Sequence, residues 1–259
     1  MTRVLLTGGT GVLGRELLPR LTAAGHKVRL MSRRAGESNA AGDVEWAQAD
    51  LLTGAGVAEA VAGIEAIVHA ASSPFKKTVE TDVEGTRRML EAAKAAGVGH
   101  AYYISIVGID KLTYSYYKAK LATERVVEGS GVPFTILRAT QFHTLLDTFL
   151  RSIFKRGPFI ICPGKTYFQL IDAGEVAQHM VDTLAKGPSG MLPDIGGPKV
   201  QSVKEIAQAW MAARGRKHIL LPMPPIGPLG AVAGGANTCP EQKFGKITWE
   251  DWLRRTYGS

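Results

Sequence analysis

The first 140 residues alternate between short apolar runs and longer stretches in which apolar residues recur every three or four positions. The short runs are rich in β-branched residues and indicate buried strands, whereas the longer spacing is typical of amphipathic helices. We expect strands at 3–7, 28–31, 44–47, 66–69, 101–106 and 134–137, and helices at 13–21, 56–62, 80–96 and 116–129. Strands that alternate with helices predict an α/β fold with a doubly wound parallel sheet, covered by helices on both faces.

Beyond about residue 140 this alternation weakens into a mixed region. Helices are expected at 143–155, 173–186 and 202–214, followed by a Pro- and Gly-rich stretch at 219–240. We expect residues 1–142 to form the α/β core and residues 143–259 a small mixed α/β cap, interleaved with the core in one compact unit. Ligands of doubly wound sheets bind at the carboxyl ends of the strands, so the cap is expected to complete a pocket there and to select the substrate.

A glycine-rich turn joins the first strand to the first helix, in the order strand, turn, helix and second strand that a dinucleotide-binding Rossmann unit requires. The first glycine permits the tight turn, the second lets the backbone approach a pyrophosphate, and the third lets the helix pack closely on the strand. Free amide groups and the helix dipole then attract the diphosphate. The residues expected to contact the dinucleotide here are Gly8, Thr10, Gly11, Val12, Leu13 and Gly14.

The end of the second strand distinguishes NAD from NADP. An acidic residue there would bind the ribose 2′-hydroxyl, whereas arginine pairs with a 2′-phosphate. The sequence reads VRLMSRR, which places Ser32, Arg33 and Arg34 at this position without an Asp or Glu. The sequence therefore predicts NADP(H), the alternative being that both arginines are only surface charges.

The formal net charge of +8 raises the question of an anionic partner. Basic clusters occur at 151–156 and at 214–217, but no helix-turn-helix or aromatic-interleaved motif accompanies them. We interpret them as a solvated face and expect no nucleic-acid partner. Prolines interrupt the longest apolar stretch, Ile219 to Ala236, and the first residues do not resemble a secretory leader. We therefore expect a soluble, cytoplasmic protein without a membrane segment.

The motif T-G-G-T-G-V-L-G at residues 7–14 resembles that of the short-chain dehydrogenase/reductase superfamily, in the extended and atypical branch that includes NmrA-like proteins. The segments TDVEGTRRMLEAAKAAGV, FTILRATQFH and FQLIDAGEVAQHMVDTL are similar to the corresponding parts of NmrA-like reductases, so the resemblance covers nearly the whole chain. It implies further cofactor contacts after the third, fourth and sixth strands. These are Asp50, Leu51, Ala70, Ala71, Ser72, Thr140, Gln141 and Phe142.

In this superfamily a Tyr-x-x-x-Lys pair on one helix performs the proton chemistry beside the nicotinamide. The chain has two such pairs, Tyr114 with Lys118 and Tyr116 with Lys120, and a two-residue offset turns them about 200° apart on a helix. The continuation L-A-T-E after Lys120 resembles the family pattern, so we expect Tyr116 to donate the proton. Lys120 would hold the nicotinamide ribose and favour the tyrosinate. The alternative is that these tyrosines only pack, with wet hydroxyls.

The resemblance also implies a catalytic serine at the end of the fifth strand. Relatives carry two adjacent serines there and use the second, whereas this chain has Ser105 followed by Ile106. Ser105 is the remaining candidate, and Thr140, Gln141 or His143 could substitute for it. A lone histidine at such a junction is more often a structural residue.

These features predict an oxidoreductase that uses NADPH to reduce a carbonyl or related group of a hydrophobic small molecule. The apolar character of the cap around Phe142, Phe149, Phe154 and Phe168 motivates this substrate class. One alternative is a catalytically silent, NADP(H)-sensing regulator, which the missing second serine favours. Another is an epimerase or ring-opening enzyme with the same cofactor. No metal-ligand spacing is present, and we expect a monomer or homodimer.

Overall fold

The computed structural model describes residues 2–34, 36, 44–74, 76–225, 230 and 232–258. Part of the Pro- and Gly-rich stretch, residues 226–229 and 231, lies outside the described residues. The chain divides into two compact units, each assembled from three segments. Unit 1 comprises residues 1–105, 115–137 and 176–193, and unit 2 comprises residues 106–114, 138–175 and 194–259.

Unit 1 is built on a seven-stranded sheet in the order β10-β6-β5-β4-β1-β2-β3. Its strands are β1 (Arg3–Thr7), β2 (Lys27–Ser32), β3 (Val44–Gln48), β4 (Ala66–His69), β5 (His100–Ile106), β6 (Phe134–Ala139) and β10 (Gly190–Met191). The ladders of β1 with β2 and β4 are parallel, so the strand order reverses direction at β1. The predicted doubly wound parallel sheet is confirmed.

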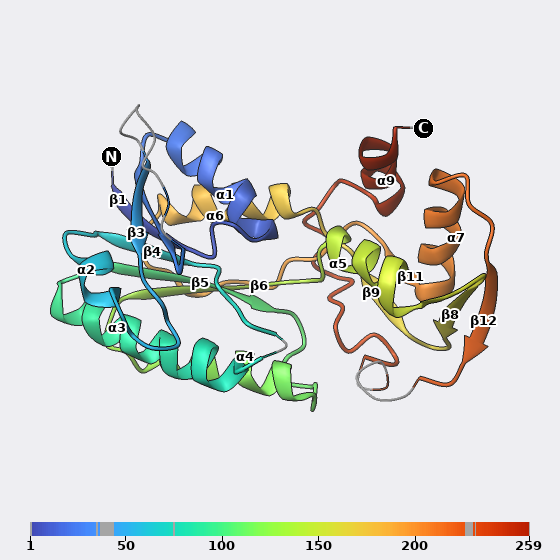
Figure 1. Ribbon diagram of the computed structural model, residues 1–259, viewed down its shortest axis with the longest axis horizontal. Helices are drawn as coiled ribbons and strands as arrows, with labels where there is room; N and C mark the ends of the chain where they lie inside the picture. Colours follow the sequence, from blue (N-terminus) through green and yellow to red (C-terminus); the bar gives the residue numbers. More distant parts are fainter. Residues whose placement is uncertain are drawn as a thin grey trace. The chain divides into compact units, whose positions relative to one another are not determined.

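Helices cover both faces of this sheet. They are α1 (Val12–Ala23), α2 (Val57–Val61), the π-helix η1 (Val79–Glu84), α3 (Gly85–Ala95), α4 (Ser115–Glu128) and α6 (Ala173–Leu184). Figure 1 shows α1 and α6 on one face and α2, α3 and α4 on the other. The helix expected at 80–96 is thus present, but its first turn is wound as a π-helix, a form that often occurs at functional sites.

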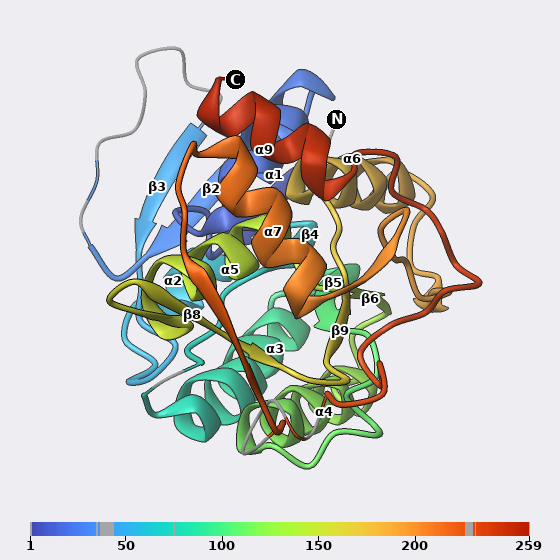
Figure 2. The ribbon, with the colours of Figure 1, turned by 90° about the vertical axis from the view of Figure 1, so that its right-hand side faces the viewer.

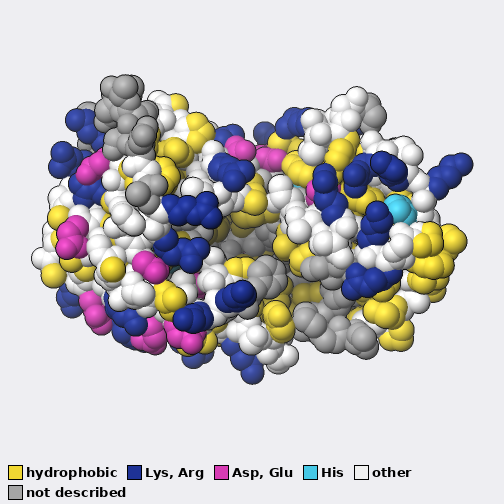
Figure 3. All heavy atoms as spheres, viewed as in Figure 1, with side chains coloured by type: hydrophobic (Ala, Val, Ile, Leu, Met, Phe, Trp, Pro, Cys, Tyr) yellow, Lys and Arg dark blue, Asp and Glu magenta, His cyan; other side chains and the backbone are white. Residues whose placement is uncertain are grey.

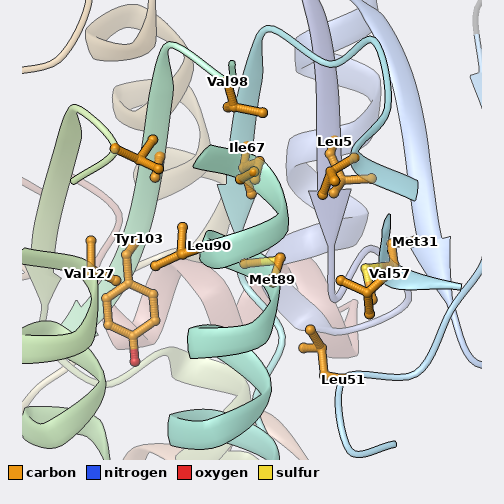
Figure 4. Packing of buried hydrophobic residues seen from close by; sticks show 14 of the residues in the cluster. Leu5, Met31, Leu51, Val57, Ile67, Met89, Leu90, Val98, Tyr103 and Val127 are labelled. Atoms are coloured by element: carbon orange, nitrogen blue, oxygen red, sulfur yellow. The ribbon is translucent and has the colours of Figure 1, made fainter. Parts of the chain in front are cut away.

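The main core of unit 1 lies between the sheet and α3. Leu5 of β1, Ile67 of β4 and Tyr103 of β5 meet Met89 and Leu90 of α3, as Figure 4 shows, and all five are essentially inaccessible to solvent. Strands covered on both faces are apolar on both sides, which explains why the sequence reads as short continuous apolar runs. This core fixes the strand ends from which the site is built.

The described part of unit 2 contains two small sheets and the helices α5, α7 and α9, which Figure 2 shows. Its strands are β7 (Lys155–Arg156), β8 (Phe159–Pro163), β9 (Tyr167–Gln169), β11 (Val200–Ser202) and β12 (Ile219–Met223). Its helices are α5 (His143–Thr148), continued by the π-helix η2 (Phe149–Ile153), α7 (Val203–Ala213) and α9 (Trp249–Tyr257). Strands β12, β8 and β7 form one sheet, and β11 and β9 form the other.

Two expectations about unit 2 need correction. The helix expected at 143–155 ends at Ile153, because Lys155 and Arg156 pair with β8 instead. The Pro- and Gly-rich stretch begins with β12, a strand that pairs in parallel with β8 although Pro222 interrupts its amide donors. Within the described part of the chain, no helix is both long and apolar enough to cross a membrane.

Candidate functional site

A cavity of about 620 Å³ opens in unit 1 where β1, β2, β3 and β4 end. It lies at the reversal of strand order beside β1, the position at which doubly wound sheets bind ligands. Of the predicted cofactor-binding residues, those that line it are Gly8, Thr10, Gly11, Ser32, Arg33, Arg34, Asp50, Leu51, Ala70, Ala71 and Ser72. The lining residues that sequence reasoning missed are Thr7, Arg15, Met31, Trp46, Leu52, Ser73 and Thr81.

The glycine turn has no room for side chains at two of its positions. Gly8 has a φ of +71°, and a Cβ there would lie 2.6 Å from the carbonyl carbon of Ala70. A Cβ on Gly14 would lie 2.2 Å from the carbonyl oxygen of Gly8, so α1 packs directly on the turn. The turn closes with a hydrogen bond of 2.9 Å from the Gly11 amide to the Gly8 carbonyl. These contacts fit the shape of a pyrophosphate cradle.

The amino-terminus of α1 leaves its first amide groups available to a ligand. Its N-cap, Gly11, supplies no side-chain hydrogen bond, and the first turn contains no acidic residue. Arg15 donates from Nε to the carbonyl of Thr10 at 3.0 Å, which holds its guanidinium beside the turn. Val12 is exposed and Leu13 is buried, and neither side chain lines the cavity. Any contact from these two residues would come from their backbone.

Arg33 and Arg34 line the cavity just beyond β2, and β3 holds their backbone. The Trp46 indole donates to the Arg34 carbonyl at 2.8 Å, and the Gln48 amide donates to the Arg33 carbonyl at 3.4 Å. Ser32 accepts the Arg34 amide at 3.2 Å. Asp50 is the one carboxylate in the described lining, and its Oδ1 accepts the amide of Leu52 at 2.9 Å. The charge around the cavity is therefore mainly positive.

Tyr116 and Lys120 lie one turn apart near the start of α4. The Tyr116 hydroxyl is 3.1 Å from Oγ of Ser72, which itself lines the cavity. Lys120 is only 4% exposed, donates to the carbonyl of Ile104 at 2.8 Å, and sits 4.1 Å from the centre of the Tyr103 ring. Burial lowers the pKa of Lys120 to about 8, against an opposing effect of Asp82 and Glu124. Lys118, in the competing pair, is exposed.

A buried carboxylate that the sequence analysis missed completes this arrangement. Asp82 of η1 accepts the Ser72 hydroxyl at 2.5 Å on one oxygen and the Ser73 amide at 2.8 Å on the other. Burial raises the pKa of Asp82. Burial also raises the pKa of Tyr116, and the negative charge of Asp82 adds to this effect. The only sequence signal for Asp82 was a charged residue near the start of the helix expected at 80–96.

The remaining polar candidates are buried. Ser105 of β5 is 3% exposed, and its hydroxyl has no hydrogen-bond partner among the described residues. His69 lies between Thr7, at 2.6 Å, and Thr86, at 2.9 Å, and burial lowers its pKa to about 3. Neither Ser105 nor His69 lines the cavity, whereas Thr7 does. His69 is therefore a neutral structural residue at ordinary pH.

Thr140, Gln141, Phe142 and His143 belong to unit 2. The Thr140 amide donates to Ile195, and Gln141 accepts from the side chain of Asn237 at 2.9 Å. The His143 ring stacks on Trp249 and Trp252 with centroids 5.8 and 5.7 Å away, and burial lowers its pKa to about 3. A histidine in this state cannot exchange protons near neutral pH, which supports the structural interpretation.

Unit 2 has a second cavity, of about 410 Å³. Its lining consists of Lys155, Trp210, Arg214, Gly215, Arg216, Lys217 and His218, without a carboxylate among the described residues. Figure 3 shows Lys and Arg side chains gathered on this face of unit 2 around a histidine. The Arg214 guanidinium lies 4.5 Å from the centre of the Trp210 ring. The two basic clusters seen in the sequence thus meet at one surface.

The chain matches the NAD(P)H-binding family over residues 8–186 and belongs to it. Solved structures agree on the fold. The NADPH-dependent quinone oxidoreductase QOR2 of Escherichia coli, complexed with NADPH, superposes with a TM-score of 0.80 at 17% identity, over 98% of this chain and 99% of that one. WbmH of Bordetella bronchiseptica, in complex with NAD+, gives 0.76 at 18% identity over the full length of both. The resemblance to the extended short-chain dehydrogenase/reductase superfamily is confirmed.

Three relatives show how diverse similar chains are. The (4-alkanoyl-5-oxo-2,5-dihydrofuran-3-yl)methyl phosphate reductase of Streptomyces griseus is 29% identical over 206 residues, or 78% of this chain and 70% of that protein. The NAD(P)H azoreductase of Xenophilus azovorans is 28% identical over 220 residues, 82% of this chain and 74% of that protein. The photosystem II assembly factor Ycf39 of Trieres chinensis is 23% identical over 188 residues, 70% of this chain and only 59% of that protein.

Proposed function

We propose that this protein is an NADPH-dependent reductase of a hydrophobic small molecule that carries a carbonyl or related group. The observation that carries the proposal is the contact between Tyr116 and Ser72, because it places a half-buried phenol beside the dinucleotide cavity. The relatives support the reaction class, since an NAD(P)H azoreductase and a (4-alkanoyl-5-oxo-2,5-dihydrofuran-3-yl)methyl phosphate reductase are among them.

The chain's own residues account for cofactor binding. The glycine turn and the first amides of α1 would hold the pyrophosphate, with Arg15 beside them. Arg33 and Arg34 would pair with the ribose 2′-phosphate, for which a planar guanidinium is well suited. Asp50 and Leu51 would contact the adenine. Neither arginine is opposed by an acidic residue at the end of β2, and this favours NADPH over NADH.

The reaction that we propose divides the work between cofactor and protein. The reduced nicotinamide supplies the hydride when it is bound. Tyr116 donates its hydroxyl proton to the oxygen of a carbonyl substrate or to the nitrogen of an azo substrate, so that its O–H bond breaks as the product O–H or N–H bond forms. Lys120, one turn further along α4, donates to the carbonyl of Ile104 and holds a buried charge on the same helix. Water restores the proton to Tyr116 after the product leaves.

The substrate class rests on the relatives rather than on the phenylalanines of unit 2. Phe154 and Phe168 are buried there and form part of its core. We therefore expect the substrates to be compounds of the kinds named for the azoreductase and for QOR2, namely azo compounds and quinones. We add aromatic ketones to this set. The NADP(H)-sensing alternative is favoured by one observation, the burial of Ser105 away from the cavity lining.

The first experiment measures NADPH and NADH affinity by calorimetry for the wild type and for Arg33→Ala/Arg34→Ala. Loss of charge-assisted hydrogen bonds to the 2′-phosphate should weaken NADPH binding by about 10- to 100-fold and leave NADH binding nearly unchanged. The matched control, Arg216→Ala/Lys217→Ala, removes the same charge from unit 2 and should leave both affinities unchanged. An unchanged ratio of the two affinities in the Arg33/Arg34 variant would contradict the NADPH preference.

Turnover then separates the reductase from the sensor. A panel of quinones, azo dyes and aromatic ketones is screened for NADPH oxidation with purified protein. Oxidation of NADPH that depends on one of these compounds supports the reductase. Tight NADPH binding without turnover across the whole panel would favour the sensor instead.

A further inference from the structure

The Ser72 hydroxyl stands between two oxygen atoms and has one proton to give. Its Oγ is 2.5 Å from Oδ2 of Asp82 and 3.1 Å from the hydroxyl of Tyr116. A short contact with a carboxylate oxygen is the stronger of the two hydrogen bonds, so the proton points to Asp82. Ser72 is then left as an acceptor, and Tyr116 must be the donor in their contact.

Asp82 is held in the orientation that this requires. Its second oxygen accepts the backbone amide of Ser73 at 2.8 Å, so both oxygens act as acceptors. Its own carbonyl accepts the hydroxyls of Thr86, at 2.5 Å, and Thr123, at 3.1 Å, which fix η1 against α3 and α4. Asp82 as a whole is only 3% exposed, so its carboxylate is largely shielded from water.

From this geometry we propose that Asp82 is a positioning residue that sets the direction of the hydrogen bond on Tyr116. Because Asp82 accepts the hydrogen bond of the Ser72 hydroxyl, Ser72 can only accept from Tyr116. This contact stabilises Tyr116 as the neutral phenol, the form that can protonate a substrate. The inference deepens the proposed reductase function and rests on it for its meaning in catalysis.

The titratable groups around Tyr116 determine how its pKa should change when the charge of Asp82 is removed. Asp82 on η1 raises the pKa of both Tyr116 and Lys120, and Glu124 on α4 also raises that of Lys120. Tyr103 on β5 and His69 on β4 face the same site, but burial keeps both of them neutral near pH 7. Removing the charge of Asp82 should therefore lower the pKa of Tyr116.

Asp82→Asn tests the proposal because an amide has only one acceptor oxygen. If that oxygen stays with the Ser73 amide, the new NH2 group donates to Ser72, and the Ser72 proton turns to Tyr116. Both the reversed hydrogen bond and the lost charge favour the tyrosinate. We expect Tyr116 to titrate lower than in the wild type by at least about half a pH unit, and the alkaline limb of kcat to move in the same direction.

The readout is an ultraviolet tyrosinate titration of the protein without cofactor, with the matching Tyr116→Phe variant subtracted to isolate one of the seven tyrosines. The control Glu80→Gln removes an exposed charge from the same π-helix and should leave the titration unchanged. An unchanged Tyr116 titration in a folded Asp82→Asn protein would overturn the proposal. Because this readout needs no turnover, it remains decisive even if the chain proves to be a sensor.

Ser72→Ala gives a second, independent test through the direction in which the Tyr116 titration shifts. Because Ser72 is exposed, this variant should fold even if Asp82→Asn does not. If Ser72 accepts from Tyr116, its loss removes a partner of the neutral phenol and lowers the titration point. If Ser72 instead donates to Tyr116, its loss raises the titration point. A downward shift supports the proposed direction, and an upward shift overturns it.

Discussion

Among single residues, Tyr116 and Tyr114 differ in ways that their sequence context does not reveal. Tyr116 is half-buried and bonded to Ser72, whereas Tyr114 is 39% exposed and precedes α4. Two overlapping Tyr-x-x-x-Lys patterns therefore occupy different surroundings. The environment of Lys120, which donates to the backbone of β5, distinguishes the pairs further from the exposed Lys118.

This difference leads to a prediction about turnover. Tyr116→Phe removes the proton donor and should lower kcat by about 10²- to 10⁴-fold, the usual contribution of general acid catalysis, with little change in NADPH affinity. Tyr114→Phe, the matched control, should retain the wild-type rate. Steady-state kinetics on the best substrate and calorimetry with NADPH check both variants. Equal rates for Tyr116→Phe and the wild type would remove Tyr116 from the mechanism.

Local sequence patterns predicted the cavity residues that follow β1 and β2 but not the hydrogen-bond partners of Tyr116. The glycine turn and the arginines after β2 were predictable because their spacing along one βαβ unit is set by local geometry. The partners of Tyr116 were not, because Ser72 lies 44 positions away and Asp82 lies 10 positions beyond Ser72. Only the packing of η1 against α4 and the β4 loop brings these three groups together.

At the level of elements, the junction of η1 and α3 connects the surroundings of Tyr116 with the cavity. Gly85 begins α3, and a Cβ on it would lie 2.7 Å from the carbonyl oxygen of Leu51 and 2.9 Å from its Cβ. Leu51 lines the cavity. The periodicity of the sequence predicted a helix here but not its π-wound start, because an apolar face looks similar at both windings.

We therefore expect Gly85→Ala to disturb both stability and cofactor binding. Overpacking against the backbone of Leu51 should lower the free energy of unfolding by about 1–3 kcal/mol and weaken dinucleotide affinity. Gly99→Ala is the control, because the nearest atom to a Cβ there, the Glu65 carbonyl oxygen, is 3.8 Å away. Denaturant unfolding and calorimetry measure the two effects. A Gly85→Ala protein as stable as Gly99→Ala would show that the helix start can shift without cost.

For the whole molecule, buried histidines determine how stability responds to acid. Burial lowers the pKa of His69 and His143 to about 3 and that of His100 to about 4. In the unfolded chain each would titrate near its ordinary value of about 6.5. Between these values the unfolded state binds protons that the folded state does not, so stability is full above about pH 6.5 and is lost as the pH falls.

Each histidine should contribute about 1.4 kcal/mol of lost stability per pH unit below 6.5. We expect the free energy of unfolding to fall clearly between pH 7 and pH 5, as measured by denaturant titration at each pH. His143→Gln removes one of these groups and should reduce the slope. A free energy of unfolding that is the same at pH 5 and pH 7 would show that these histidines titrate in the folded protein as they do in the unfolded chain.

The interleaving of the two units along the chain also determines the order in which they can fold during translation. The chain passes between units after residues 105, 114, 137, 175 and 193. Strand β10, at the edge of the sheet beside β6, belongs to the last segment of unit 1. During synthesis on the ribosome, the residues up to Ser72 that line the cavity therefore emerge long before the sheet that supports them can be completed. Unit 1 cannot close until residue 191 is available, by which time more than half of unit 2 has still to be translated.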